Sequence, residues 1–313
     1  MVWSRRPRFN PIQSVSEAAL YADAELLAGS RDLLLLAECM VEGYAHGMHR
    51  SPYAGSSQEF ATYRAFLPGD PLQRIDWKVY GRTDDLYVRE FEQETNLRGY
   101  LFLDGSRSMD FGAGAGNKFT YGRLLCAVLA VLLRRQQDAP GLAVFGKGES
   151  IPVDDWWPPS TRRDHLEHIV HHLESSVADG PHDHLGGLAD LVDECHRRSL
   201  AAIITDALVD PAELKEMLGR LRMRGSKVIL FQLLAREELD PRIEDEVVLV
   251  DRETGAERAV DGTVYAQLYQ ENLSRIRADI EQICHDTETD YCFLPTDQPL
   301  DEALRRFLLL RSR

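Results

Sequence analysis

The chain has 313 residues, which is enough for one large domain or two modest ones with a substantial buried core. Its hydrophobic content of 44% and charged content of 28% are those of an ordinary water-soluble protein. The 51 acidic and 36 basic residues give a formal net charge of −15. Such a surface repels the phosphate backbone, which argues against nucleic acid as a partner.

No segment is typical of a membrane protein or a secreted one. The richest apolar stretch, residues 32–40, is too short and too charged to span a bilayer. The first residues, MVWSRRPRFNP, lack the apolar segment of a secretory signal. The five cysteines are scattered and never form a Cys-x-x-Cys pair, so neither a disulfide framework nor a thiolate zinc site is indicated. We therefore expect a cytoplasmic protein without membrane insertion.

The first part of the chain, residues 1–96, mixes helical and strand patterns. Apolar residues recur at spacings of three and four within residues 14–46, which predicts one or two helices. A turn-rich stretch follows at 47–57, and residues 86–94 alternate in the manner of a strand. We assign these residues to a separate N-terminal segment.

From residue 97 onward, apolar strands alternate with helices. Buried strands are predicted at 99–104, 141–146, 199–205, 227–234 and 291–294, with a further strand at 150–154 beside the second of them. Helices are predicted at 118–136, 161–176, 186–197, 211–222, 264–285 and 300–310. This alternation predicts an α/β domain over residues 97–313, with a mainly parallel sheet and helices on both faces. A β-hairpin around Glu253-Thr254-Gly255 interrupts it as an insertion at about 241–262.

Polar side chains follow two of these strands. Asp104, Ser106 and Ser108 form an Asp-x-Ser-x-Ser loop directly after the first strand, and Asp206 follows the strand at 199–205. Ligands of an open parallel sheet bind at the carboxyl ends of its strands. Mg²⁺ prefers such oxygen ligands and keeps some of its bound waters. Mn²⁺ or Ca²⁺ could occupy the same site. A metal held this way keeps an open position, which a carboxylate of a partner could fill.

Together with Thr205-Asp206, this loop resembles the metal-ion-dependent adhesion site of von Willebrand factor A domains. The preceding region resembles the bacterial family called domain of unknown function 58 (DUF58). The residues that carry this second resemblance are Gly55, Glu59-Phe60, Arg64, Pro68-Gly69-Asp70, Arg74-Ile75-Asp76-Trp77 and Arg82. The resemblance runs from about Leu33 to the C-terminus and points to the short soluble branch of the family. It implies a von Willebrand factor A-like (Rossmann-like) fold and association with MoxR-type AAA+ ATPases, which act on the assembly or activation of protein complexes.

The resemblance also implies a threonine ligand on a further loop, where this chain instead reads DGPHDHL at residues 179–185. Asp183 could substitute as an oxygen ligand. Alternatively the third position is lost, and the site is degenerate and binds metal weakly.

Each candidate feature has a structural alternative. Serine and aspartate also cap helices and shape turns, so the Asp-x-Ser-x-Ser loop could be a capping turn. The alternating Arg and Asp residues of 64–82 could form an ion-pair network that supports the N-terminal segment. His165, His168 and His172 share a helical face, which we interpret as solvated rather than zinc-binding. The stretch from Gly112 to Lys118 does not match the sequence pattern of a phosphate-binding loop. We expect it to be a flexible loop that precedes a helix.

These patterns favour a non-enzymatic interaction module. Its metal, held by Asp104, Ser106, Ser108 and Asp206, would recruit an acidic segment of a client protein or of a MoxR-type ATPase. A metal-dependent phosphohydrolase is the first alternative, although Ser106 stands where such enzymes usually place the acid that protonates the leaving group. A structural scaffold with a degenerate metal site is the second.

Overall fold

The computed structural model describes residues 32–48, 60–66, 75, 77–83, 85–91, 97–148, 150–181, 185–241, 246–250 and 257–312. They fall into two compact units. The smaller unit is Gly43–Asn96, and the larger unit joins Met1–Glu42 with Leu97–Arg313.

The smaller unit contains a two-stranded antiparallel sheet. Strand β1 (Phe60–Ala65) pairs with β2 (Tyr87–Phe91), and helix α3 (Trp77–Thr83) lies between them in the sequence. The strand predicted at 86–94 is confirmed, whereas β1 was not predicted. Most of the charged family residues between 55 and 76 lie outside the described residues, so their proposed ion-pair network stays a prediction.

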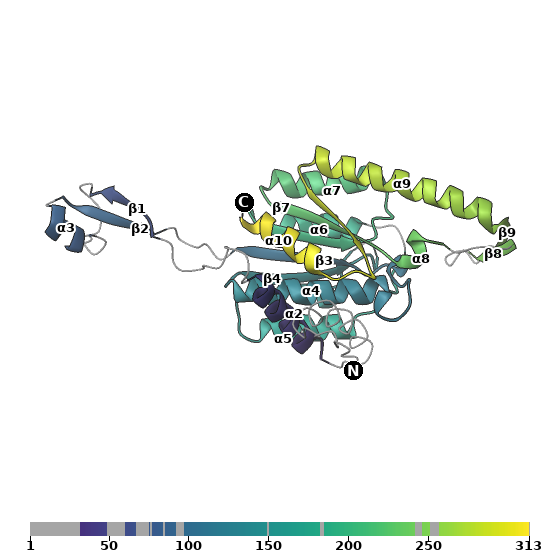
Figure 1. The fold of residues 1–313 in the computed structure, drawn as a ribbon, viewed down its shortest axis with the longest axis horizontal. Coiled ribbons are helices and arrows are strands. Elements are labelled where there is room, and N and C mark those ends of the chain that lie inside the picture. Colours follow the sequence, from purple (N-terminus) through teal and green to yellow (C-terminus); the bar gives the residue numbers. More distant parts are fainter. Residues whose placement is uncertain are drawn as a thin grey trace, which may run out of the picture. The chain divides into compact units, whose positions relative to one another are not determined.

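The larger unit is built on a six-stranded sheet with the order β10-β7-β6-β3-β4-β5 (Figure 1). Its strands are β3 (Arg98–Asp104), β4 (Ala139–Phe145), β5 (Trp156–Trp157), β6 (Leu200–Thr205), β7 (Lys227–Leu234) and β10 (Asp290–Pro295). All pairs are parallel except β4 with β5. The chain runs outward from β3 to β4 and then returns to β6 on the other side of β3. This doubly wound order places the topological switch point between β3 and β6.

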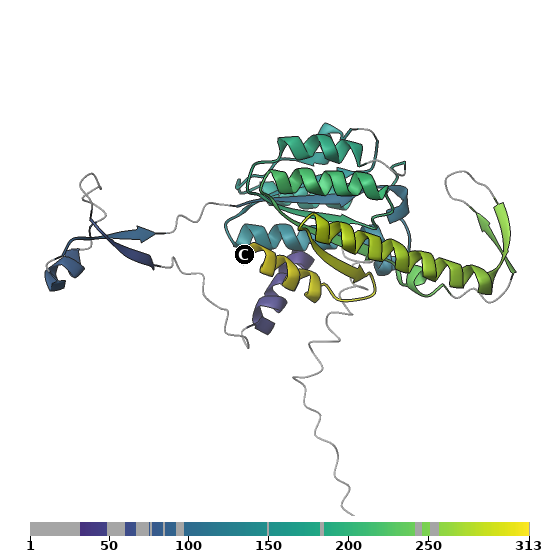
Figure 2. The ribbon, with the colours of Figure 1, turned by 90° about the horizontal axis from the view of Figure 1, so that it is seen from above.

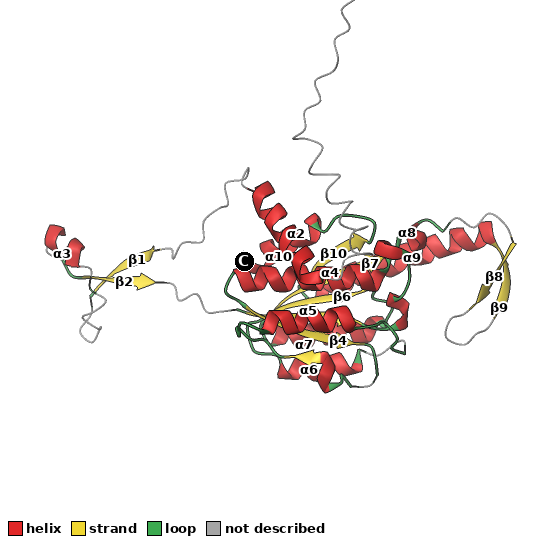
Figure 3. Ribbon diagram, turned by 90° about the horizontal axis from the view of Figure 1, so that it is seen from below, coloured by secondary structure: helices red, strands yellow, loops and turns green. Residues whose placement is uncertain are grey.

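Helices cover both faces of the sheet, as predicted (Figures 1 and 3). One face carries α4 (Lys118–Arg135), α5 (His165–Ser175) and α10 (Asp301–Ser312). The other carries α6 (Gly186–Glu194), α7 (Pro211–Met223) and α9 (Gly262–Asp286). Strands β4 and β6 are buried along their whole length, which explains why they read as continuous apolar runs. The predicted α/β fold class is therefore confirmed.

Helix α2 (Leu33–Met48) also contacts the α/β unit, although we predicted it within the N-terminal segment. The amide of Leu33 donates to Glu174 Oε1 at 2.8 Å, and Arg135 pairs with Glu42 at 2.9 Å. The buried residues Leu33, Leu36 and Met40 recur at helical spacing. The apolar stripe in the sequence is thus the face that this helix buries.

The predicted hairpin insertion is confirmed by the antiparallel pairing of β8 (Glu246–Val250) with β9 (Glu257–Asp261), which precedes α9 (Figure 2). The prediction of a strand at 150–154 is wrong. A 3₁₀ turn occupies Val153–Asp155, and the neighbour of β4 is the two-residue strand β5. Pro158 and Pro159 end β5 because proline has no N–H to donate to a ladder. A membrane span needs a long helix with few charged residues, and no helix in the described part of the chain meets both conditions.

Candidate metal centre

Two aspartates meet at the switch point of the sheet. Asp104 is the last residue of β3, and Asp206 directly follows β6. These two strands are parallel neighbours, with Leu103 opposite Ile204. Both carboxylates are almost fully buried, with exposed fractions of 3% and 1%. The sheet therefore brings together two acidic groups that lie about a hundred residues apart in the chain.

The two serines lie on the loop that leaves β3. The amide of Ser106 donates to Asp104 Oδ1 at 2.9 Å, which folds the loop back over the strand end. A 3₁₀ turn, Arg107–Met109, then places Ser108 beside Ser106, and their hydroxyl oxygens lie 3.0 Å apart. Three predicted ligands, Asp104, Ser106 and Ser108, thus converge in the way the Asp-x-Ser-x-Ser spacing suggests.

A second loop runs alongside this one. The amide of Arg107 donates to the carbonyl oxygen of Gly180 at 2.9 Å, and the amide of Gly180 donates to the carbonyl oxygen of Gly105 at 3.1 Å. This is the loop on which the sequence lacks the expected threonine. Asp183, the suggested substitute, lies outside the described residues, so its role as a ligand stays a prediction.

Glycine at position 146 permits this close packing. Gly146 follows β4 with a φ of +82°, and a Cβ atom there would lie 2.9 Å from Asp104 Oδ1 and 3.1 Å from Ser106 N. A larger residue would press on the carboxylate and adopt an unfavourable backbone conformation.

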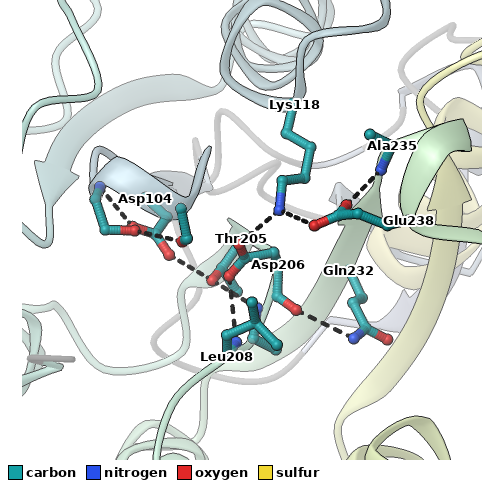
Figure 4. Close-up of polar contacts among 11 residues, drawn as sticks. Asp104, Lys118, Thr205, Asp206, Leu208, Gln232, Ala235 and Glu238 are labelled. Carbon is teal, nitrogen blue, oxygen red and sulfur yellow. Dashed lines mark hydrogen bonds and ion pairs between the residues drawn. The ribbon is translucent and has the colours of Figure 1, made fainter. Parts of the chain in front are cut away.

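The turn after β6 is held by side chains of the site itself (Figure 4). Thr205 Oγ1 donates to Asp104 Oδ2 at 2.6 Å and accepts from the amide of Ala207 at 2.9 Å. Ala207 has a φ of 57°, unusual for a residue other than glycine. The amide of Leu208 donates to Asp206 Oδ1 at 3.2 Å, and Gln232 Nε2 donates to the Asp206 carbonyl at 3.1 Å. These contacts fix Asp206 in place at the cost of a strained backbone.

Sequence analysis missed a buried cation at the site. Lys118, the first residue of α4, is only 1% exposed, and its ammonium lies 2.9 Å from Asp206 Oδ2 and 2.7 Å from Glu238 Oε1 (Figure 4). Glu238 Oε2 in turn accepts from the amide of Ala235 at 2.7 Å. The sequence signal was a lysine at the start of a largely apolar helix, after Asn117, whose side chain caps that helix.

The loop before Lys118 was predicted to be a flexible lead into the helix. It contains a 3₁₀ turn, Gly114–Gly116, and the hydroxyl of Thr296 donates to the carbonyl oxygen of Gly116 at 2.6 Å. The amide of Lys118 donates to the carbonyl oxygen of Phe111 at 2.9 Å. These contacts anchor the loop and position Lys118, whereas its predicted flexibility stays a prediction.

Burial and mutual repulsion govern the electrostatics of the centre. Burial, together with the charge of Asp206, raises the pKa of Asp104 to about 6. Burial alone would lower the pKa of Lys118, but Asp206 and Glu238 raise it above its ordinary value, so the ammonium stays charged. Three carboxylates and one ammonium leave two net negative charges when all are ionised.

A divalent cation would neutralise this charge and stabilise Asp104 in its ionised form. The donor set is hard and oxygen-based, which suits Mg²⁺ or Mn²⁺. Within the described part of the chain, no three His, Cys, Asp or Glu side chains form a metal-binding group. A cation here would therefore depend on the two aspartates, the serine hydroxyls and water.

The predicted solvated histidine face is wrong for part of α5. His165 is buried, and His165, His168 and His172 surround the indole of Trp157 at ring-centroid distances of 6.4, 5.7 and 6.1 Å. His172 Nε2 lies 2.9 Å from Asp155 Oδ1. The imidazoles therefore pack on an aromatic side chain, and only His168 is largely exposed.

Comparisons with known proteins point to one family. Residues 62–279 match the model of the family described as "Protein of unknown function DUF58". An uncharacterized protein of Mycobacterium tuberculosis is 27% identical over 302 residues, which cover 93% of this chain and 91% of that protein. The uncharacterized protein YeaD of Bacillus subtilis is 26% identical over 196 residues, or 61% of this chain and 44% of that protein.

The chain also matches solved structures, at low sequence identity. The conserved hypothetical protein BatB of Bacteroides thetaiotaomicron is 14% identical and matches with a TM-score of 0.44 over 69% of this chain and 100% of that chain. The VWA domain of SpRpn10 is 12% identical, with a TM-score of 0.37 over 67% of this chain and 94% of that chain.

Proposed function

We propose, from the premise that this chain belongs to the DUF58 family, that the protein is a non-enzymatic protein-interaction module. We propose also that its α/β unit has a von Willebrand factor A-like fold. A divalent cation, Mg²⁺ or Mn²⁺, binds at Asp104, Ser106, Ser108 and Asp206. The cation recruits an acidic segment of a partner, either a client protein or a MoxR-type AAA+ ATPase. Asp183 is proposed as a further oxygen ligand.

The observation that carries this proposal is the convergence of two buried carboxylates and two serine hydroxyls at the switch point. Asp104 and Asp206 supply the charge that attracts a cation, and burial together with the charge of Asp206 raises the pKa of Asp104. Ser106 and Ser108 are neutral, so a bound divalent ion would keep an affinity for one more carboxylate. A partner that supplies this carboxylate would complete the coordination shell.

The alternative of a phosphohydrolase is weaker on this geometry. Such an enzyme needs an acid near its nucleophilic aspartate, and the position two residues after Asp104 is Ser106. Lys118 would be the natural phosphate ligand, but it is buried and already paired with Asp206 and Glu238. We therefore assign no catalytic residue to this site.

Isothermal titration calorimetry with Mg²⁺ and Mn²⁺ tests the proposal, on the wild type and on Asp104→Ala. We expect saturable binding to the wild type, a higher melting temperature with metal, and loss of both effects in the variant. Melting of the metal-free proteins controls for folding of Asp104→Ala. Absence of binding in a folded wild type would contradict the metal dependence and favour the scaffold alternative.

A further inference from the structure

The buried ion triad of Lys118, Asp206 and Glu238 is not explained by the metal site itself. Lys118 comes from the start of α4, Asp206 from the end of β6, and Glu238 from the short helix α8 (Arg236–Leu239). The ammonium lies between the two carboxylates, with contacts of 2.9 and 2.7 Å (Figure 4). Burial of a charged lysine is opposed by desolvation, so its pairing with a candidate ligand requires a reason.

We infer that Lys118 is an internal cation that competes with the divalent metal for Asp206, while Glu238 draws Lys118 away and so sets the strength of that competition. This inference rests on the proposed function and adds a positioning pair to it. Lys118 holds Asp206 Oδ2, and the amide of Leu208 holds Oδ1. Asp206 therefore reaches a metal by sharing its oxygens or through water, and the wild-type site binds divalent cations weakly.

Glu238 is placed to tune this competition. Its Oε1 accepts from Lys118, and its Oε2 accepts from the amide of Ala235 at the start of α8. The second hydrogen bond fixes the carboxylate in position, so it draws the ammonium without itself moving toward the metal. Lys118 is 1% exposed and is therefore closed to a partner protein, so its influence is confined to the site.

The paired substitution Lys118→Met with Glu238→Gln separates competition from long-range charge. It removes one positive and one negative charge, so the net charge of the centre is unchanged. The glutamine side chain introduced by Glu238→Gln keeps an oxygen that can accept from the amide of Ala235, and methionine fills much of the space of the lysine stem. Asp206 loses its ammonium partner, so we expect the affinity for Mg²⁺ to rise by about tenfold. Damage to the structure alone would lower the affinity.

The single substitution Glu238→Gln is the matched variant with the opposite sign. Lys118 then has Asp206 as its only carboxylate partner in the triad and holds it more strongly. We expect Glu238→Gln to bind Mg²⁺ more weakly than the wild type. If the paired variant is too unstable to study, equal or tighter Mg²⁺ binding by Glu238→Gln still overturns the competition, whereas weaker binding also follows from the lost negative charge.

Calorimetry with Mg²⁺ and melting curves with and without Mg²⁺ decide the question, with Asp104→Ala as the control for a lost site. The order expected for affinity is paired variant, wild type, Glu238→Gln. Binding by the paired variant but not by the wild type supports the competition and rejects metal dependence in the natural protein. Equal affinities of wild type and paired variant overturn the competition and leave the proposed function intact. Binding by neither protein overturns the metal site itself, and the competition with it.

Discussion

At the scale of single residues, the centre is organised around Asp104. Its carboxylate accepts from the amide of Ser106 at 2.9 Å and from the hydroxyl of Thr205 at 2.6 Å. These donors favour the ionised form, but burial and the neighbouring Asp206 outweigh them and raise the pKa to about 6. Without a cation, the folded protein therefore holds a proton at Asp104 more tightly than the unfolded chain does.

This raised pKa predicts the pH dependence of stability in metal-free protein. Since the folded pKa exceeds the ordinary value of 3.8, protonation of Asp104 stabilises the fold fully below pH 3.8, and that stabilisation is lost as pH rises through about 6. We expect the free energy of unfolding to fall over this range by up to about 3 kcal/mol relative to Asp104→Asn. Urea unfolding in EDTA at several pH values measures it. Identical pH profiles of the two proteins would contradict the prediction.

At the scale of elements, a buried carboxylate anchors helix α10 at the edge of the sheet opposite the metal centre. Asp138, which is buried between α4 and β4, accepts from the amide of Leu97 at 3.0 Å through one oxygen. Its other oxygen accepts from Arg311 Nε in α10 at 2.6 Å. One carboxylate thus joins the start of β3 to the end of the last helix.

Substitution of Asp138 tests how much this carboxylate stabilises the fold. Asp138→Ala leaves the Leu97 amide and the Arg311 guanidinium without their acceptor, and we expect a loss of about 2–4 kcal/mol in the free energy of unfolding. Glu302→Ala is the matched control, because Glu302 pairs with Arg305 and Arg306 on the exposed side of the same helix. The control should change stability by no more than about 1 kcal/mol. Equal effects of the two substitutions in chemical denaturation would count against a special role of Asp138 in anchoring α10.

At the scale of the whole molecule, the α/β unit buries its core in two layers around the sheet. Four of the five cysteines lie in that core, and burial raises the pKa of each of those thiols. Cys39, on α2, is exposed. Thiol chemistry therefore reports on the integrity of this unit.

We expect a thiol reagent such as Ellman's reagent to modify one cysteine, Cys39, quickly in the native protein. The other four should react only as fast as the unit opens, and all five should react in denaturant. The variant Cys39→Ser should abolish the fast phase. A fast phase of more than one thiol in the native wild type would show that the core opens more readily than its burial implies.

The sequence by itself determined the α/β class, the hairpin insertion and the convergence of Asp104, Ser106, Ser108 and Asp206 at one edge of the sheet. These depend on local information, because apolar runs mark buried strands and the carboxyl ends of parallel strands share an edge. Tertiary structure alone decided that Lys118 lies between Asp206 and Glu238 and that three histidines of α5 surround Trp157. Those contacts join residues from separate elements, and hydrophobic periodicity carries no record of which buried side chains will face each other.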